Sequence, residues 1–274
     1  MSTFTAFSLL LFLLLGSLAG FVAGLLGIGG GIILVPLFLW VFTSTGFAPE
    51  IVVHSAFGTS LAIITLTATS STFGHRKRGN VGWHQVGYLI LGGIVGALLG
   101  AWWASMLSGD WLKGLFGVMQ ILVALKMVGF HPRMPPEENR PRPPAALLAI
   151  GLAGGTFSAF FGVGGGIVAV PLLVLALGLP IHLAVGNSSA LIVVSSFFGA
   201  ISYMYHGQHL PNLPPFSVGF VNLLVVLLVA PVTMLTARLG VRIASRTSHD
   251  RLLKVFATLL VLVGLRMIYR AWLA

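Results

Sequence analysis

Gly27-Ile-Gly-Gly-Gly-Ile-Ile-Leu-Val-Pro36 is the most informative stretch of this sequence, because the chain carries it twice. The second copy is Gly162-Val-Gly-Gly-Gly-Ile-Val-Ala-Val-Pro171, in the other half of the chain. A motif of this length and composition is very unlikely to recur by chance. We therefore interpret the chain as two copies of one structural unit.

Shorter matches extend the repeat along each copy. Gly58-Thr59-Ser60 matches Gly186-Asn187-Ser188, and Asp110 matches Asp250. The order of the matches is kept while the interval between matched positions drifts slightly, so we expect insertions in loops and the same elements in both copies.

The chain is too apolar for a soluble fold. Of its 274 residues, 57% are hydrophobic and 7% are charged, whereas soluble domains carry about 25% charged residues. The mean hydropathy is +1.02, and lipid accommodates helices that are apolar all round. We expect an all-α polytopic membrane protein. The apolar segments are 5–26, 30–43, 50–73, 84–107, 111–129, 145–162, 165–178, 181–205, 214–238 and 251–272.

The ends of the two units follow from the same pattern. The polar, proline-rich stretch 130–144 separates the copies and is predicted to be a linker outside the membrane. The first repeat is then 1–129 and the second is 145–274. Segment 5–26 is predicted to be a spanning helix rather than a signal peptide, because no Lys or Arg precedes Arg76.

Lys and Arg gather in three places, which sets the predicted topology. Twelve of the fifteen lie in or beside 74–82, 130–144 and 239–250, the exceptions being Lys113, Arg266 and Arg270. Loops rich in Lys and Arg stay in the cytoplasm. The loop 206–213 has neither residue and is predicted to lie outside. The halves then have opposite orientations, with about five segments each and both termini outside, a frequent plan in secondary transporters. The net charge of +10 therefore indicates topology rather than nucleic-acid binding.

Each glycine motif precedes a short apolar segment. Glycine inside a helix costs about 0.8–1 kcal/mol relative to alanine, so the clusters favour unwound backbone before each short helix. Such backbone at membrane depth lines a cavity or is buried by protein, and the free N–H groups of a helix start attract anions. Close helix packing by small residues is the alternative. The glycines of the predicted solute site are Gly27, Gly29, Gly30, Gly31, Gly162, Gly164, Gly165 and Gly166.

Polar side chains inside two of the longer apolar segments complete the predicted site. Hydroxyl and amide groups within the membrane need partners, and they can hydrogen-bond the oxygen atoms of an oxyanion. The alternative is that the hydroxyls bond carbonyls of their own helix or pack at helix contacts. The candidates are Thr59, Ser60, Asn187, Ser188 and Ser189.

Acidic residues are rare and fall at segment ends or in loops. The chain has five of them, and none lies in the middle of an apolar segment, so an anionic or neutral solute is favoured over a cation. Coupling to protons through His54 or His182 is one interpretation and an interfacial position is the other. The pair His206 and His209 is a weak metal motif, because no Cys or carboxylate accompanies it.

The two glycine motifs, each followed by Gly-(Thr/Asn)-Ser, resemble the sulfite exporter TauE/SafE family of membrane permeases over nearly the whole chain. The stretch Arg78-Gly79-Asn80-Val81 is similar to that family's loop after its third segment. The resemblance implies a permease of the cytoplasmic membrane for sulfite, an organosulfonate or a related anion. Asn187 stands where the family usually has Thr, which puts the preferred solute in doubt.

The sequence therefore predicts a permease that moves a small anion by alternating access, with no cofactor and no metal site. An uncoupled, channel-like facilitator is the alternative within transport. An intramembrane enzyme is less favoured, because we find no Ser with an adjacent His or Lys at membrane depth and no intramembrane pair of Asp residues. A membrane scaffold would not require two glycine-broken segments. The expected partners are a small anionic solute and the lipid bilayer.

Overall fold

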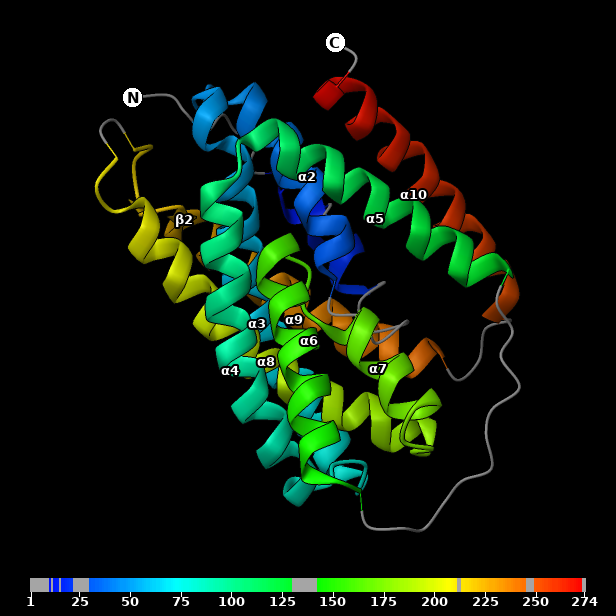
Figure 1. The fold of residues 1–274 in the computed structure, drawn as a ribbon. Coiled ribbons are helices and arrows are strands. Elements are labelled where there is room, and N and C mark those ends of the chain that lie inside the picture. Colours follow the sequence, from blue (N-terminus) through cyan, green and yellow to red (C-terminus); the bar gives the residue numbers. More distant parts are fainter. Residues whose placement is uncertain are drawn as a thin grey trace.

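The computed structural model describes residues 10, 12–14, 16–21, 30–129, 142–210, 213–244 and 249–272, which are mostly helical (Figure 1). Most of the predicted linker and the Gly27 and Gly29 positions lie outside these ranges. The helices are α2 Gly31–Ser44, α3 Pro49–Lys77, α4 Trp83–Met106, α5 Gly109–Gly129, α6 Pro144–Phe161, α7 Gly166–Leu175, α8 Ile181–Gly207, α9 Leu223–Ala244 and α10 His249–Trp272.

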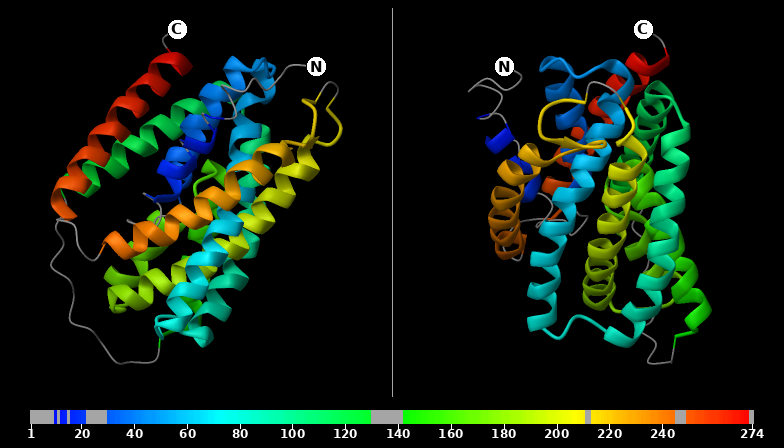
Figure 2. Two further views of the ribbon diagram at one scale, coloured as in Figure 1. Left: turned by 180° about the vertical axis from the view of Figure 1, so that it is seen from behind. Right: turned by 90° about the vertical axis from the view of Figure 1, so that its left-hand side faces the viewer.

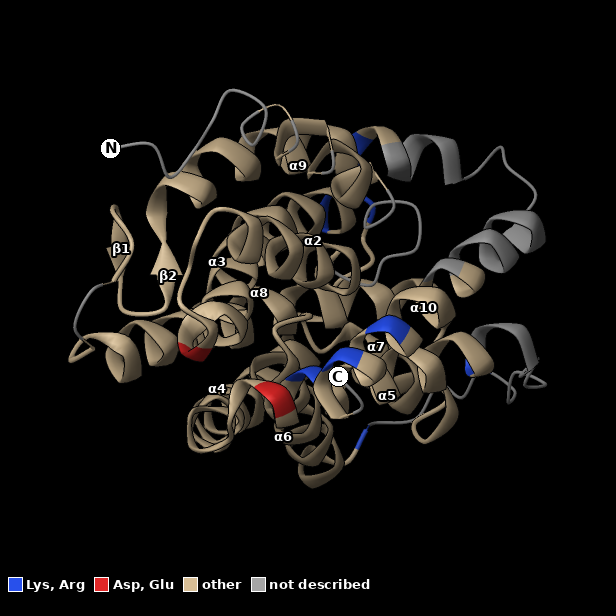
Figure 3. Ribbon diagram, turned by 90° about the horizontal axis from the view of Figure 1, so that it is seen from above, with Lys and Arg blue, Asp and Glu red and all other residues tan. Residues whose placement is uncertain are grey.

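Four helices in the described part of the chain are long and apolar enough to cross a bilayer, namely α3, α4, α6 and α8. The shorter apolar helices there include α2, α7 and the 223–239 part of α9. This length and composition support a multi-pass membrane protein. Charged residues are sparse on the ribbon (Figure 3), and none of the described Lys, Arg, Asp or Glu side chains is buried.

The prediction of one helical segment over 214–238 is wrong at its start. A small antiparallel hairpin pairs β1, Ser217–Val218, with β2, Val221–Asn222, before α9 begins. Pro214 and Pro215 lack the N–H groups that a helix needs. Gly219 then turns the chain with φ 55°, and its Cα lies so close to the Met204 carbonyl that a Cβ would overlap it. The fold is therefore helical with one short hairpin.

Helices α3 and α8 form the centre of the molecule and run in opposite directions (Figures 1 and 2). Gly58 of α3 lies against Tyr203, whereas Leu61, further along α3, lies against Gly199, which is earlier in α8. Most of the apolar length of both helices is buried. The polar side chains predicted for the solute site lie on these two helices, so they sit in the interior rather than against lipid.

Two further helix pairs flank the centre. Parallel helices α4 and α6 touch through Gly92, Gly96 and Gly100, where an added Cβ would overlap the backbone of Leu148, Leu152 and Thr156 in turn. This one-turn glycine spacing allows backbones to approach closely, as in many membrane helix pairs. Antiparallel helices α5 and α10 meet at Gly117 and Gly264, and the Trp111 and Trp272 rings are 5.6 Å apart at one end of the pair.

Candidate functional site

The two glycine motifs meet in the middle of the molecule. Helix α2 begins after Gly30, which has φ 76°. A Cβ on Gly31 would overlap the Cα of Val163 and lie 2.7 Å from the carbonyl oxygen of Gly162. Because the two backbones are in contact, only glycine fits at Gly31. We call this region, made of Gly30, Gly31, Gly162 and Val163, the central junction.

Helix α3 supports the central junction from the side. The Ser60 hydroxyl donates to the carbonyl oxygen of Gly162 at 2.8 Å, and both groups are buried. Gly164, with φ 76°, sits between Ile64 of α3 and Ile192 of α8, and a Cβ there would be 3.2 Å from each. Each isoleucine lies one helical turn after the Ser of its own Gly-(Thr/Asn)-Ser motif. The second glycine motif thus contacts matching positions of both halves of the sequence.

The amide of Asn187 holds the loop between α3 and α4. Its Oδ1 accepts from the Gly82 N–H at 2.8 Å, and its Nδ2 donates to Gln85 Oε1 at 2.7 Å. Gly186 lies against Asn80, whose carbonyl oxygen would be overlapped by a Cβ. We call Asn187, Gly82 and Gln85 the Gly82 clasp. Asn187 is about 9 Å along α8 from its start, and the loop residue Gly82 that it bonds is half-buried.

Thr59 holds the hairpin after α8 in the same manner. Its Oγ1 accepts from the Asn222 N–H at 3.1 Å. The neighbouring Gly58 lies against Phe220, and a Cβ there would be 3.1 Å from the Phe220 carbonyl oxygen. We call Thr59 and Asn222 the Asn222 clasp.

The two clasps match in sequence as well as in geometry. Thr59 and Asn187 occupy the same place in the two Gly-(Thr/Asn)-Ser motifs. Their partners Gly82 and Asn222 are separated by the same interval as the matched pair Asp110 and Asp250. Each half therefore uses the same position of its central helix to hold the corresponding loop of the other half.

The remaining predicted hydroxyls differ in their environments. Ser189 donates to the Val185 carbonyl of its own helix at 2.9 Å, which is the alternative considered above for such residues. Ser188, the counterpart of Ser60, is fully buried, and among the described residues its Oγ has no hydrogen-bond partner. Ser188 thus differs from Thr59 and Asn187, which hold loops. Direct contact of these residues with a solute stays a prediction.

Sequence reasoning missed Asn222, Gln85 and Gln120. Asn222 also caps α9, since its Oδ1 accepts from the Val225 N–H at 3.1 Å, and an Asn immediately before an apolar run is a helix-start signal. Gln120 of α5 is fully buried, and its Nε2 donates to the Ile32 carbonyl at 3.1 Å. Its signal was a lone amide inside an apolar segment, which is expensive unless it has a partner.

The two histidines considered for proton coupling differ in burial. His54 is buried, with its Nε2 3.1 Å from the Ala104 carbonyl oxygen and its ring stacked 4.9 Å from Phe220. Its counterpart His182 is exposed. Both interpretations, proton coupling and an interfacial position, stay predictions for the two residues. Among the described residues, no group of three or more His, Cys, Asp or Glu is arranged to hold a metal ion.

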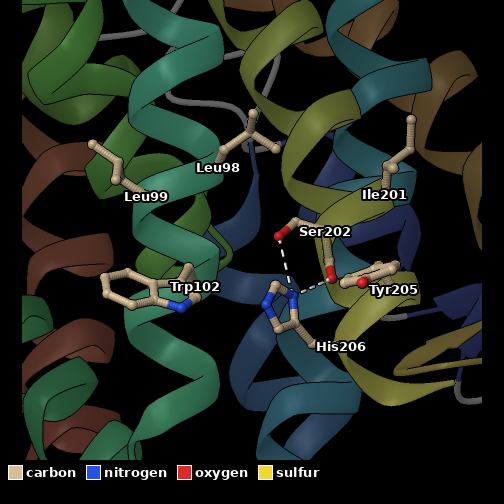
Figure 4. Close-up of a pocket in the computed structure, with 7 residues that line it drawn as sticks. All are labelled: Leu98, Leu99, Trp102, Ile201, Ser202, Tyr205 and His206. Carbon is tan, nitrogen blue, oxygen red and sulfur yellow. Dashed lines mark hydrogen bonds between the residues drawn. The ribbon is translucent and has the colours of Figure 1, made fainter. Parts of the chain in front are cut away.

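A groove of about 440 Å³ lies between α4 and α8 near their adjoining ends (Figure 4). The His206 ring bonds back to its own helix, with Nδ1 2.7 Å from the Ser202 carbonyl oxygen. The groove is otherwise apolar and contains no residue of the predicted solute site. The lining residues are Leu98, Leu99, Trp102, Ile201, Ser202, Tyr205 and His206.

Comparison with known proteins finds relatives along nearly the whole chain. The chain is 30% identical over 259 residues to a probable membrane transporter protein of Haemophilus influenzae, covering 94% of this chain and 97% of that protein. It is 26% identical over 279 residues to the probable membrane transporter protein YunE of Bacillus subtilis, covering 96% and 98%. No solved structure matches the chain. The model of the sulfite exporter TauE/SafE family matches residues 12–267, and the chain therefore belongs to that family.

Proposed function

We propose that this protein is a permease that moves a small anion across the cytoplasmic membrane by alternating access, with the central junction as the solute site. The observation that carries the proposal is the contact between the two glycine motifs beside buried neutral hydroxyls. The start of a helix presents free N–H groups to an anion. No Lys or Arg side chain among the described residues is buried there, so the solute would be held by dipoles and hydroxyls that release it easily.

The two clasps support alternating access. Each holds a loop of one half against the central helix of the other half, and the two helices run in opposite directions. In our proposal the halves are inverted repeats. Opening the Gly82 clasp would expose the junction to one side of the membrane, and opening the Asn222 clasp would expose it to the other. A permanently open pore would have no use for two matching closures.

The sidedness of the proposal comes from charge. The loop of the Gly82 clasp follows Arg76, Lys77 and Arg78, so we place it in the cytoplasm. The hairpin of the Asn222 clasp and the Trp272 end of α10 lie at the opposite end of the molecule (Figure 1), so we place them outside. This orientation is the one predicted for a chain with both termini outside.

Sulfite and organosulfonates are the solutes that we propose, because the family model carries the name sulfite exporter. The test is flux into proteoliposomes that contain the purified protein. We expect uptake of labelled sulfite or a sulfonate, and faster uptake when the vesicles are preloaded with the same unlabelled anion. Uptake without this acceleration would favour the channel-like facilitator. Uptake of a cation instead of an anion would refute the proposed site.

A further inference from the structure

Gln120 of α5 uses only half of its amide group. The side chain is fully buried, and its Nε2 donates to the Ile32 carbonyl at 3.1 Å. Within the described ranges of the chain, its Oε1 has no hydrogen-bond partner. A buried carbonyl without a donor destabilises the fold unless something supplies that donor.

Packing alone does not call for an amide at this place. The matching position in the second half is Leu260, which follows Asp250 by the same interval as Gln120 follows Asp110. Leu260 is buried too. An apolar side chain therefore fills the equivalent site. Packing does not explain why position 120 carries an amide.

Gln120 lies at the edge of the central junction. Ile32, to which it bonds, directly follows Gly31. Phe116 lies one helical turn earlier on α5, with its ring 5.7 Å from that of Phe57 and 6.3 Å from that of Phe161. Phe161 directly precedes Gly162. This face of α5 is therefore turned toward the place where the two glycine motifs meet.

A structural role explains only the nitrogen of the amide. Pro36 has no N–H, so the Ile32 carbonyl lacks the helical partner that residue 36 would normally supply. Gln120 Nε2 replaces that partner. The second half has the same arrangement of Pro171 one helical turn after Ile167, yet it carries Leu260 at the position that matches Gln120. Capping after a proline thus does not require a glutamine, and it leaves Oε1 without an explanation.

We propose that Gln120 Oε1 accepts a hydrogen bond from the solute, so that the preferred anion carries an O–H or N–H group. This inference rests on the proposed permease function. The Ser188 hydroxyl and the start of α2 can donate to anion oxygens, but a carbonyl oxygen only accepts. An anion without an O–H or N–H group would place its own oxygen lone pairs against those of Gln120 Oε1. Oε1 would then still lack a hydrogen-bond donor. An oxyanion that retains a proton, or a sulfonate that bears a hydroxyl or amino group, would satisfy it.

The test compares solutes that differ by one hydroxyl, namely 2-hydroxyethanesulfonate and ethanesulfonate, in binding titrations of the purified full-length protein. A site built to bond a hydroxyl rejects the analogue that lacks it. We expect wild type to bind the hydroxyl-bearing anion about ten- to 100-fold more tightly, and Gln120→Leu to bind both nearly equally. The donor can also be a proton that the oxyanion itself retains. To test this, sulfite is titrated in acidic buffer, where it is protonated, and in alkaline buffer, where it is not. We expect wild type to bind the protonated form more tightly, and Gln120→Leu to show no such difference.

A second variant separates solute recognition from capping. In Pro36→Ala/Gln120→Leu, the restored N–H of residue 36 caps the Ile32 carbonyl, so the fold does not depend on the amide. We expect this double variant still to lack the preference for a donor, and Leu260→Gln to retain it. Recovery of the wild-type preference in the double variant would overturn the inference, as would equal binding of both sulfonates by wild type. Binding of no tested anion by wild type would refute the proposed function itself.

Discussion

Removal of the Asn187 amide should open one side of the transporter and leave the other closed. Asn187→Ala deletes the hydrogen bonds to the Gly82 N–H and to Gln85. Each bond contributes a net of about 0.5–1.5 kcal/mol, so the closed form of the Gly82 clasp should lose roughly 1–3 kcal/mol. A change of that size shifts a two-state equilibrium by roughly five- to 150-fold. The loop should therefore leave α8 far more often than in wild type.

The chain has no cysteine, so a single introduced thiol reports on this opening without background. Ser188→Cys is nearly isosteric and places the thiol next to Asn187 at a fully buried position. We would measure its rate of reaction with a membrane-impermeant maleimide added to either face of the membrane. In the Asn187→Ala background we expect the rate to rise at least fivefold from the cytoplasmic face only.

A matched control is Ser189→Ala. This change removes a hydroxyl that bonds only the Val185 carbonyl of its own helix, so the thiol of Ser188→Cys should be labelled at the same rate with and without it. Thr59→Ala, which removes the single bond of the Asn222 clasp, should raise labelling from the outer face instead. An unchanged rate in Asn187→Ala would refute the reasoning. So would an equal rise from both faces, because that result indicates general loosening of the fold.

Three further predictions concern the backbone and the topology. Gly165→Val should abolish transport, because even a Cβ there would overlap the carbonyl of Gly154, whereas Gly74→Ala has open space and should be neutral in the flux assay. Gly31→Ala should lower the thermal unfolding temperature of the purified protein, because its Cβ would overlap the backbone of the second glycine motif. A cysteine at Gly79 should be labelled only from the cytoplasm and one at Gln208 only from outside, and the reverse pattern would contradict the proposed orientation.

Much of the architecture could be predicted from local features. Hydropathy located the helices, because burying an apolar helix in lipid requires a run of suitable length and little else. The start of each short helix was also readable, since α2 begins after Gly30 and α7 after Gly165, inside the repeated motif. The hairpin before α9 was missed because its apolar residues, such as Val218, Phe220 and Val221, run directly into an apolar helix. Pro214 and Pro215 were the overlooked signal.

The roles of the polar side chains could not be predicted from such local features. Sequence alone placed Asn187 inside a membrane helix, where its amide can face a solute, a neighbouring helix or a loop. The structure pairs it with Gly82 in the loop between α3 and α4, and pairs Thr59 with Asn222 in the hairpin before α9. Only the packing of the two halves against each other brings these groups together.

Composition thus identified a membrane protein, and repetition revealed one glycine motif in both halves of the sequence, because hydrophobicity and repeat spacing are properties of the chain itself. The contact between the two motifs, the loops held by Asn187 and Thr59, and the half-used amide of Gln120 depended on tertiary structure. A hydrogen bond between distant residues is set by the directions of two side chains in space, and no local pattern of residues encodes those directions.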